Sequence, residues 1–215
     1  MFFYLELPNL PQPPAHFINR CYDIMKTATT DNDFMTGWIS SKEFQTRKII
    51  KNGKEMNTRS QRGFHIGDDW EHWVRENIVS DFYDAGLRIS FGENTNIHGP
   101  HCDNPDKWKL YYLIDKGEDG DNAETVFYYD PGKPIEIRNM QVGINYCVNN
   151  IDRLVPIFKV KIPLHTWVLL NVNVLHGVEN IEGNRINLAV LINKDQLEFT
   201  IKLTIIRNLK NWKLR

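Results

Sequence analysis

The chain has 215 residues, of which 41% are apolar and 25% charged, as in ordinary globular proteins. Its formal net charge is −1, so no overall field attracts it to nucleic acid or to a membrane surface. No apolar run reaches the roughly 20 residues of a membrane span. Three cysteines without metal-ligand spacing argue against a disulfide framework. We therefore expect a cytoplasmic protein and a single domain over residues 1–215.

Residues 1–85 predict a helical support. Pro13 and Pro14 suit a first helical turn, because proline there loses no helical hydrogen bond. The apolar residues that follow share one helix face: Phe17, Ile18, Cys21, Ile24 and Met25. Asp68 or Asp69 can cap a second helix. Its predicted buried side carries Trp70, Trp73, Val74, Asn77 and Ile78.

A basic segment at residues 47–62 contains Arg47, Lys48, Lys51, Lys54, Arg59 and Arg62 against one acid, Glu55. One hypothesis is a mobile arm that holds an acidic or phosphate-bearing substrate. The other is a solvated hairpin around Asn52 and Gly53, a pair that favours a type I′ turn. Charge runs are usually only solvated, which favours the hairpin.

After residue 85 the pattern changes to short apolar stretches separated by turns. We expect strands at Leu87–Gly92, His98–Asp103, Lys107–Ile114, Glu124–Asp130, Arg153–Ile162, Thr166–Val172, Val174–Asn180, Arg185–Ile192 and Leu197–Ile206. This spacing predicts a mainly β protein, an antiparallel sandwich or barrel over residues 86–207. The preceding helices are expected to cover one of its faces.

Two histidines and an aspartate lie close together in the sequence. Alternate residues of a strand share a face, so His101 and Asp103 should project together, with His98 on the other side. His176, in a later strand, is a candidate third ligand. Two histidines and one carboxylate on one face suit Fe(II) and leave coordination positions open. The polar residues expected to orient the imidazoles are Asn173, Glu179 and Asn180.

An arginine follows this set at a regular spacing. Arg185 comes nine positions after His176, and residues 181–184 form a turn between them. A turn there would place Arg185 on the neighbouring strand, deeper in the same barrel. Burying an arginine is costly unless an anion pairs with it, and its fork of donors matches a carboxylate.

These motifs resemble the Fe(II)/2-oxoglutarate-dependent oxygenases, in particular the prolyl-4-hydroxylase-like branch. The matching stretches run between residues 87 and 193 in the family's order and read HCDNP, YYLI, ETVFYYDP and LHGVENIEGNRINLAVLI. The resemblance implies a double-stranded β-helix, which is a cupin-like jelly roll.

The resemblance also implies roles for individual residues. His101, Asp103 and His176 would bind Fe(II), and Arg185 would pair with the distal carboxylate of the cosubstrate 2-oxoglutarate. Tyr112, the second tyrosine of a pair, matches a position that donates its hydroxyl to the same carboxylate. Aromatic packing is the alternative for either tyrosine. Asn187 stands where many relatives carry a small hydroxyl residue.

The implied activity is that of a dioxygenase. Such enzymes hydroxylate a C–H bond with O2 and convert 2-oxoglutarate to succinate and CO2, with ascorbate as a possible supporting reductant. The first expectation for the substrate is a prolyl, amino-acid or peptidyl group, by analogy. One alternative is the same chemistry on nucleic acid, supported only by residues 47–62. Another is a non-enzymatic jelly-roll binding or structural protein with a vestigial metal site.

Overall fold

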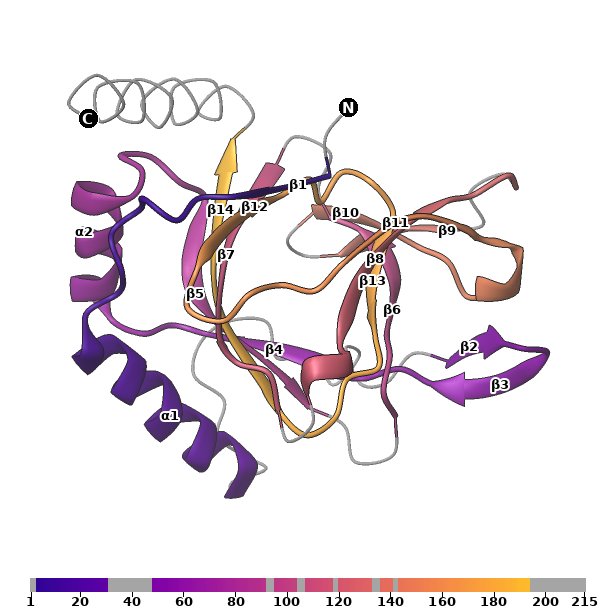
Figure 1. The fold of residues 1–215 in the computed structure, drawn as a ribbon, viewed down its shortest axis with the longest axis horizontal. Helices are drawn as coiled ribbons and strands as arrows, with labels where there is room; N and C mark the ends of the chain where they lie inside the picture. Colours follow the sequence, from indigo (N-terminus) through magenta and orange to yellow (C-terminus); the bar gives the residue numbers. More distant parts are fainter. Residues whose placement is uncertain are drawn as a thin grey trace.

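The structure is a computed structural model that describes residues 3–30, 48–91, 95–103, 107–117, 120–132, 136–140 and 143–193. These residues form two α-helices and two large antiparallel sheets that face each other (Figure 1). The predicted strand Leu197–Ile206 and the basic residue Arg47 lie outside the described residues.

Each large sheet has six strands. The first has the order β1 (Tyr4–Glu6), β12 (Trp167–Leu170), β7 (Lys107–Asp115), β14 (Arg185–Asn193), β5 (Asp84–Phe91) and β4 (Ser60–Phe64). The second has the order β11 (Val155–Val160), β8 (Glu124–Tyr129), β13 (His176–Glu179), β6 (His98–Cys102), β10 (Gly143–Cys147) and β9 (Glu136–Met140). Strands β1, β4, β9 and β10 were not predicted.

The connections between the sheets follow a jelly roll. From β5 to β8 the chain changes sheet at every step, and it does so again from β11 to β14. Only the stretch from β8 to β11 stays within the second sheet, where β9 and β10 form a hairpin. Eight strands wound in this way are the double Greek key of a jelly roll. The prediction of a double-stranded β-helix core is therefore confirmed.

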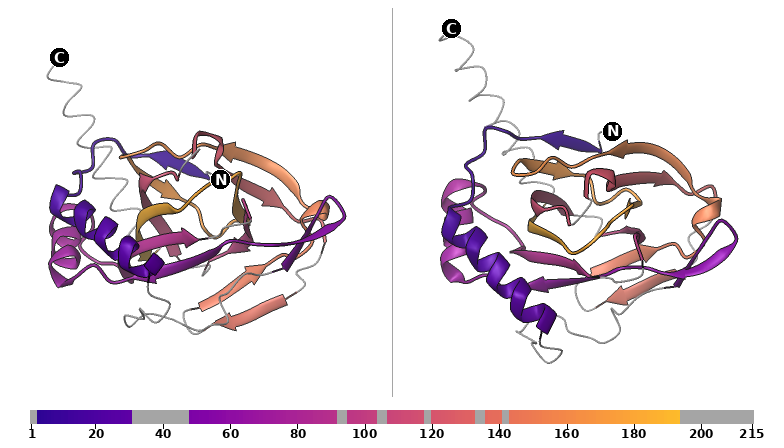
Figure 2. Two further views of the ribbon diagram at one scale, coloured as in Figure 1. Left: turned by 90° about the horizontal axis from the view of Figure 1, so that it is seen from below. Right: turned by 60° about the horizontal axis from the view of Figure 1, so that its bottom comes forward.

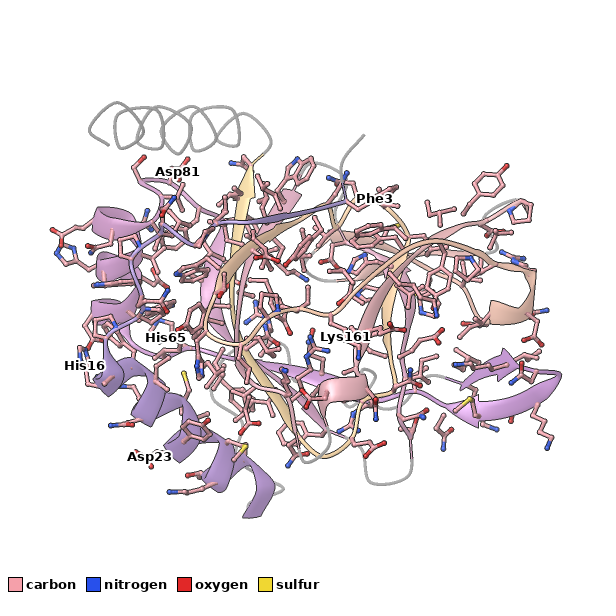
Figure 3. All side chains as sticks on the ribbon, viewed as in Figure 1. Phe3, His16, Asp23, His65, Asp81 and Lys161 are labelled. Carbon is pink, nitrogen blue, oxygen red and sulfur yellow. The ribbon has the colours of Figure 1, made fainter. Side chains whose placement is uncertain are left out.

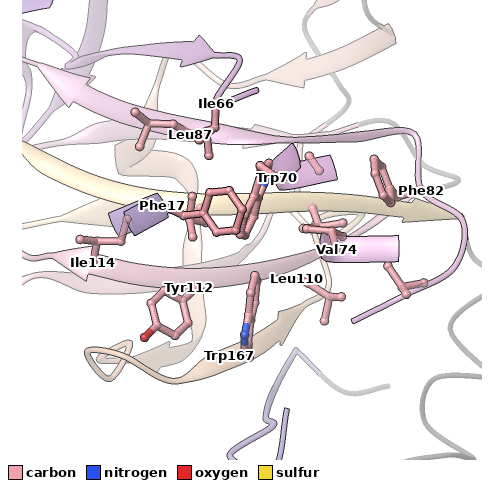
Figure 4. Packing of buried hydrophobic residues seen from close by; sticks show 14 of the residues in the cluster. Phe17, Ile66, Trp70, Val74, Phe82, Leu87, Leu110, Tyr112, Ile114 and Trp167 are labelled. Atoms are coloured by element: carbon pink, nitrogen blue, oxygen red, sulfur yellow. The ribbon is translucent and has the colours of Figure 1, made fainter. Parts of the chain in front are cut away.

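Both helices cover the outer face of the first sheet (Figures 1 and 2). They are α1 (Ala15–Thr30) and α2 (Asp68–Asn77). Figure 4 shows Phe17 of α1 and Trp70 of α2 packed together above the sheet, with ring centroids 5.3 Å apart. Trp70 is fully buried, and burying a side chain of this size contributes several kcal/mol. The predicted helical support is present.

The start of α2 differs from the prediction. Gly67 is the N-cap and no side chain caps the helix, so the assignment of Asp68 or Asp69 as the cap was wrong. Both aspartates lie in the first turn, where carboxylates favour the exposed N–H groups. Asp69 also binds Arg20 of α1 through two contacts of 2.7 and 3.0 Å, which ties the helices together.

The basic segment forms a hairpin rather than a free arm. Strands β2 (Lys48–Lys51) and β3 (Lys54–Asn57) are joined at Asn52 and Gly53, whose φ angles are 54° and 69°. Both values are positive, as a type I′ turn requires. The Asp152 carboxylate accepts hydrogen bonds from the backbone N–H groups of these two residues at 2.5 and 2.7 Å. The turn is thereby fixed to the rest of the molecule.

The hairpin lies on the face of the second sheet that is turned away from the first. Ile49 is 1% exposed and packs with Val126 and Tyr128 of β8. Phe127, between them, points to the opposite face and contacts the core between the sheets. Lys51 pairs with Glu179 at 3.2 Å, so part of the hairpin's positive charge is neutralised.

Among the described residues, we find no helix with both the length and the apolar character needed to cross a membrane.

We predict that Ile49→Ala lowers the free energy of unfolding by about 2–4 kcal/mol, because it opens a cavity beneath the hairpin. The matched control is Ile50→Ala on the same strand, where the side chain is 39% exposed. That change should cost less than about 1 kcal/mol. Urea denaturation of both variants measures the difference, and equal costs would contradict the anchored hairpin.

Candidate metal centre and anion site

The structure brings together the three side chains that were predicted to bind a metal. His101 lies on β6, Asp103 directly follows this strand, and His176 opens β13. The two histidines are paired across neighbouring strands, and their rings are 4.5 Å apart. One potential ligand atom from each of the three residues lies within 4.8 Å of the others. No other such group of His, Cys, Asp or Glu occurs in the described part of the chain.

A glycine allows the two strands to lie so close. A Cβ atom on Gly177 would come within 2.7 Å of the carbonyl oxygen of His98, nearer than real side chains approach a backbone. The residue after His176 therefore has to be glycine for β13 to pair with β6 in this register. This requirement follows from backbone packing alone and needs no ligand.

Backbone carbonyls set the orientation of both imidazoles. Nδ1 of His101 is 2.9 Å from the carbonyl oxygen of Gly99, and Nδ1 of His176 is 2.9 Å from that of Val174. An Nδ1–H group that donates to a carbonyl leaves the lone pair on Nε2, ready for a metal.

Of the side chains that we expected to orient the rings, Glu179 does not take this part. Glu179 accepts a hydrogen bond from the Tyr128 hydroxyl at 2.6 Å and pairs with Lys51, on the outer face of the sheet. The carbonyl that orients each histidine belongs to the residue two positions before it. Because every residue has a backbone carbonyl, the residue types in the sequence do not reveal such contacts.

Electrostatics keep both imidazoles neutral. Burial lowers the pKa of His101 well below its usual value, and the neighbouring His176 and His98 lower it further. Burial is also the main reason why the pKa of His176 is lowered. Burial alone would raise the pKa of the Asp103 carboxyl, but the attraction of Lys109, His101 and His176 outweighs it and holds that pKa below its ordinary value. At neutral pH the site offers two lone pairs and one carboxylate.

This donor set fits a divalent transition metal such as Fe(II). Two imidazole nitrogens and one carboxylate oxygen from one side of a cavity form a facial set, with coordination positions left for other molecules. His98 is not part of the set, although its ring lies 4.8 Å from that of His101. Figure 3 shows His16 and His65 beside the helices, and neither belongs to the ligand set.

Arg185 points into the space between the sheets, but not from the predicted strand. It opens β14, in the first sheet, whereas His176 lies in the second. The prediction of a neighbouring strand was therefore wrong, because the turn at residues 181–184 crosses between sheets. Arg185 is 4% exposed. The next residue, Ile186, packs in the core between the helices and the first sheet, which we call the helix-side core. Alternation then directs Arg185 inward.

The tyrosine beside Arg185 is Tyr111 and not Tyr112. Tyr112 lies in the helix-side core, with its ring 5.1 Å from that of Trp167 (Figure 4), and its hydroxyl donates to Oε1 of Gln12 at 2.6 Å. Tyr111 is on the opposite face of β7, where its ring centroid lies 5.9 Å from the guanidinium carbon of Arg185. Its hydroxyl is within hydrogen-bonding reach of that guanidinium. We had predicted that Tyr112 points inward, and the structure shows that Tyr111 does so instead.

The guanidinium of Arg185 has unused donors. Its Nε and Nη1 atoms are buried and have no hydrogen-bond partner, and no carboxylate of the described residues forms an ion pair with it. Nearby on the inward face of β14, the Nδ2 atom of Asn187 is also buried without a partner. Such groups are costly to bury in the absence of a ligand. They mark a site for an anion.

A second buried guanidinium adds positive charge behind this site. Arg59, assigned above to the basic segment, is 3% exposed and donates to the backbone carbonyls of Thr95, Ser90, Ile181 and Gly183. Burial lowers its pKa, and repulsion by Arg185 lowers it further. Because its described partners are neutral carbonyls, both positive charges remain uncompensated.

One strand links the anion site to the metal ligands. On the inward face of β7, the Lys109 ammonium is 2.6 Å from Oδ2 of Asp103, and Tyr111, two residues further along, reaches Arg185. Two residues of a strand span about 7 Å. The two sites therefore lie beside successive inward residues of one strand.

A cavity of about 170 Å³ adjoins Arg185. The other residues that line it are Leu113, Lys116, Asp121, Ala123, Lys161 and Ile162. A larger cavity of about 220 Å³ lies between α2 and the edge of the first sheet. Neither of these two cavities is lined by any of the three metal ligands. The larger of the two cavities therefore does not mark the candidate site.

We predict that His176→Ala weakens the binding of Co(II) or Mn(II) by more than roughly 100-fold, because loss of even an outer contact to a ligand costs about 10–100-fold. Calorimetric titration of the metal into each variant gives the affinity. The control is His72→Ala, which removes an exposed histidine of α2 and should bind as the unaltered protein does. Equal affinities for the two variants would contradict the proposed ligand set.

We also predict that Arg185→Met raises the free energy of unfolding of the ligand-free protein by about 1–4 kcal/mol, because it removes an uncompensated buried charge. Arg88→Met is the contrasting control. Arg88 pairs with Asp84, and removing only the cation leaves a carboxylate that is mostly buried, so this variant should be less stable. Denaturant unfolding measures both, and a loss of stability in Arg185→Met would exclude the uncompensated charge.

Comparison with known proteins gives likenesses only at the level of structure. No family model matches the chain, and no curated protein matches it in sequence. Among solved structures, the protein is similar to AviO1 from Streptomyces viridochromogenes Tue57, with 14% identity and a TM-score of 0.47 over 89% of this chain and 90% of that one.

Two prolyl hydroxylases are also similar. For the viral collagen prolyl hydroxylase of Paramecium Bursaria Chlorella virus-1, solved with 2-oxoglutarate, the identity is 13% and the TM-score 0.44, over 90% of this chain and 97% of that one. For a prolyl-4-hydroxylase of Pseudomonas putida, the values are 10% and 0.43, over 88% and 91%. These structures include the class of protein that the sequence motifs resemble. At such low scores, the assignment of a function rests on the geometry of the site.

Proposed function

We propose that the protein is an Fe(II)- and 2-oxoglutarate-dependent dioxygenase that hydroxylates a C–H bond. The observation that supports this most is the pairing of two features along the inward face of one strand. The His–Asp–His set lies beside Lys109 of β7, and the buried Arg185, which has no ion-pair partner among the described residues, lies beside Tyr111 of the same strand. A dicarboxylate that chelates a metal at one end and carries an anion at the other satisfies both.

The chain's own residues would hold each end of the cosubstrate. Arg185 and the Tyr111 hydroxyl would bind the distal carboxylate, and the Asn187 amide would donate from the same wall. Charge-assisted hydrogen bonds of this kind contribute about 1.5–3 kcal/mol each. When bound, Fe(II) supplies the activation of O2, with one oxygen atom going to succinate and the other to the hydroxylated product.

The protein would also exclude water from the reaction. The wall between the two sheets is apolar near the metal ligands, where Phe127 lies 5.9 Å from the ring of His176. Val168 and Leu170 of β12 belong to the same buried cluster. An enclosed apolar cavity strengthens the electrostatic interactions inside it and limits side reactions.

For the substrate, we propose a prolyl, amino-acid or peptidyl group, on the basis of the motif resemblance. The carboxylate at Asp103 supports hydroxylation rather than halogenation, since halogenating relatives have a small residue at the matching position. The nucleic-acid alternative has less support, because Lys48 pairs with Glu55 and Lys51 with Glu179 in the hairpin that motivated it. A vestigial site gives no physical reason to keep Arg185 buried.

The direct test is the conversion of 2-oxoglutarate to succinate by the purified protein with Fe(II), O2 and ascorbate, in the absence of substrate. We expect slow uncoupled turnover that His176→Ala abolishes. A screen of amino acids and peptides for a mass gain of one oxygen atom then identifies the substrate. Absence of succinate formation by the unaltered protein would favour a non-enzymatic role.

We predict that Tyr111→Phe weakens 2-oxoglutarate binding by roughly 10-fold, the effect of losing one hydrogen bond to a charged group. Tyr112→Phe is the matched control, because its hydroxyl contacts Gln12 in the helix-side core. That variant should keep the affinity of the unaltered protein. Titration of 2-oxoglutarate into the Mn(II)-loaded variants compares them, and a larger effect at Tyr112 would reverse the assignment of the two tyrosines.

A further inference from the structure

A lysine stands inside the candidate metal centre. Lys109 is on the inward face of β7, and its ammonium lies 2.6 Å from Oδ2 of Asp103. Its side chain is 17% exposed, and it forms no ion pair with any other carboxylate of the described residues. The motif resemblance assigned no role to this residue.

The two oxygen atoms of the Asp103 carboxylate face different partners. Oδ1 lies 3.4 Å from Nε2 of His101, the nitrogen whose lone pair is free for a metal. Oδ2 faces the Lys109 ammonium on the other side. Oδ1 is therefore the carboxylate oxygen nearer to the metal-binding nitrogen of His101, and Oδ2 is the one beside the lysine.

The proposed chemistry limits Asp103 to one metal bond. An octahedral ion bound by two imidazoles and one carboxylate oxygen keeps three positions, two for a chelating 2-oxo acid and one for O2. A carboxylate that bound through both oxygens would take one of these three. A residue that occupies Oδ2 prevents this loss.

Lys109 compensates the charge of the buried Asp103 carboxylate, but an apolar pair at these positions would stabilise the fold as well. An ammonium in a largely buried site costs more than a methionine of similar length, and buried ion pairs replaced by apolar side chains often give equal or greater stability. Other buried positions of β7 carry apolar side chains, such as Leu110 and Leu113. Lys109 instead places a cation at the inward position of β7 that contacts Asp103, the carboxylate proposed to bind the metal.

We propose that Lys109 is a positioning residue, which holds Oδ2 of Asp103 so that the carboxylate binds the metal through one oxygen. This inference rests on the proposed function. The lysine would not bind the metal or the substrate. It would act through Asp103, and would thereby keep the coordination position that the chelating cosubstrate needs.

The experiment uses the full chain loaded with Co(II), in which the visible absorption reports the number and geometry of the ligands. We compare the unaltered protein with Lys109→Met and Lys109→Arg, the second of which keeps a cationic donor. Lys51→Met is the matched control, because it removes the cation of another partly buried Lys–Glu pair on the outer face. Each protein is titrated with 2-oxoglutarate, and its thermal unfolding is recorded.

We expect Lys109→Met to bind Co(II) with an altered spectrum, and to bind 2-oxoglutarate at least 10-fold more weakly. Lys109→Arg should restore the spectrum and most of the affinity, and Lys51→Met should match the unaltered protein in both. If Lys109→Met does not fold, Lys109→Gln, which keeps an uncharged N–H donor, is measured against Lys109→Arg by the same two readouts.

The outcomes separate this inference from the proposed function. If the unaltered protein binds Co(II) and 2-oxoglutarate and the Lys109 variants share its spectrum and affinity, the positioning role is wrong and the function stands. If the unaltered protein binds neither, both fail. A loss of affinity in Lys109→Met without a spectral change would also overturn the proposal, because a general loss of stability or charge would explain it.

Discussion

The pairing of β6 with β13 is the constraint on which the rest of the site depends. It sets His101 opposite His176 in the second sheet, and the glycine after His176 permits the close approach of the two backbones. Strand β7 of the facing sheet then supplies Lys109 and Tyr111 from one face. A jelly roll brings these elements together because its successive strands alternate between two sheets, so residues distant in the sequence share one interior.

The interior is unusual for its distribution of charge. Near the metal ligands, a carboxylate and an ammonium are paired, and the imidazoles are neutral. Further along, Arg185 and Arg59 bring two positive charges, and neither forms an ion pair with an acid among the described residues. Such an arrangement lowers the stability of the fold, and the binding of a dianion would offset this loss. The charge pattern therefore favours a ligand of the kind that we propose, which chelates the metal at one end and carries a negative charge at the other.

Much of this could be predicted from the sequence, for a definite physical reason. The His-x-Asp spacing reflects strand periodicity, which is local. The roles of the distal histidine and of the arginine nine residues later follow from the order of motifs that the chain shares with the family it resembles. The errors concern what is not local. Tyr111 takes the inward position that was predicted for Tyr112. The reason is that the face of β7 that points inward depends on the helices that pack against its other face. The sheet that carries Arg185 depends on how a turn crosses the barrel, and the carbonyls that orient the histidines carry no side-chain signal.

The clamp around Arg59 has a consequence for the conditions under which the protein can work. Its two Nη atoms donate to four peptide carbonyls, from β5, from the segment before β6 and from the turn before β14, so the side chain is held in place. It acts instead as a fixed source of positive potential, supplied by a group that does not lose its proton in proteins. Because the Arg59 side chain is 3% exposed, ions in the solvent screen this potential less than they would screen a charge on the surface. Retention of the proposed 2-oxo acid should thus depend little on salinity.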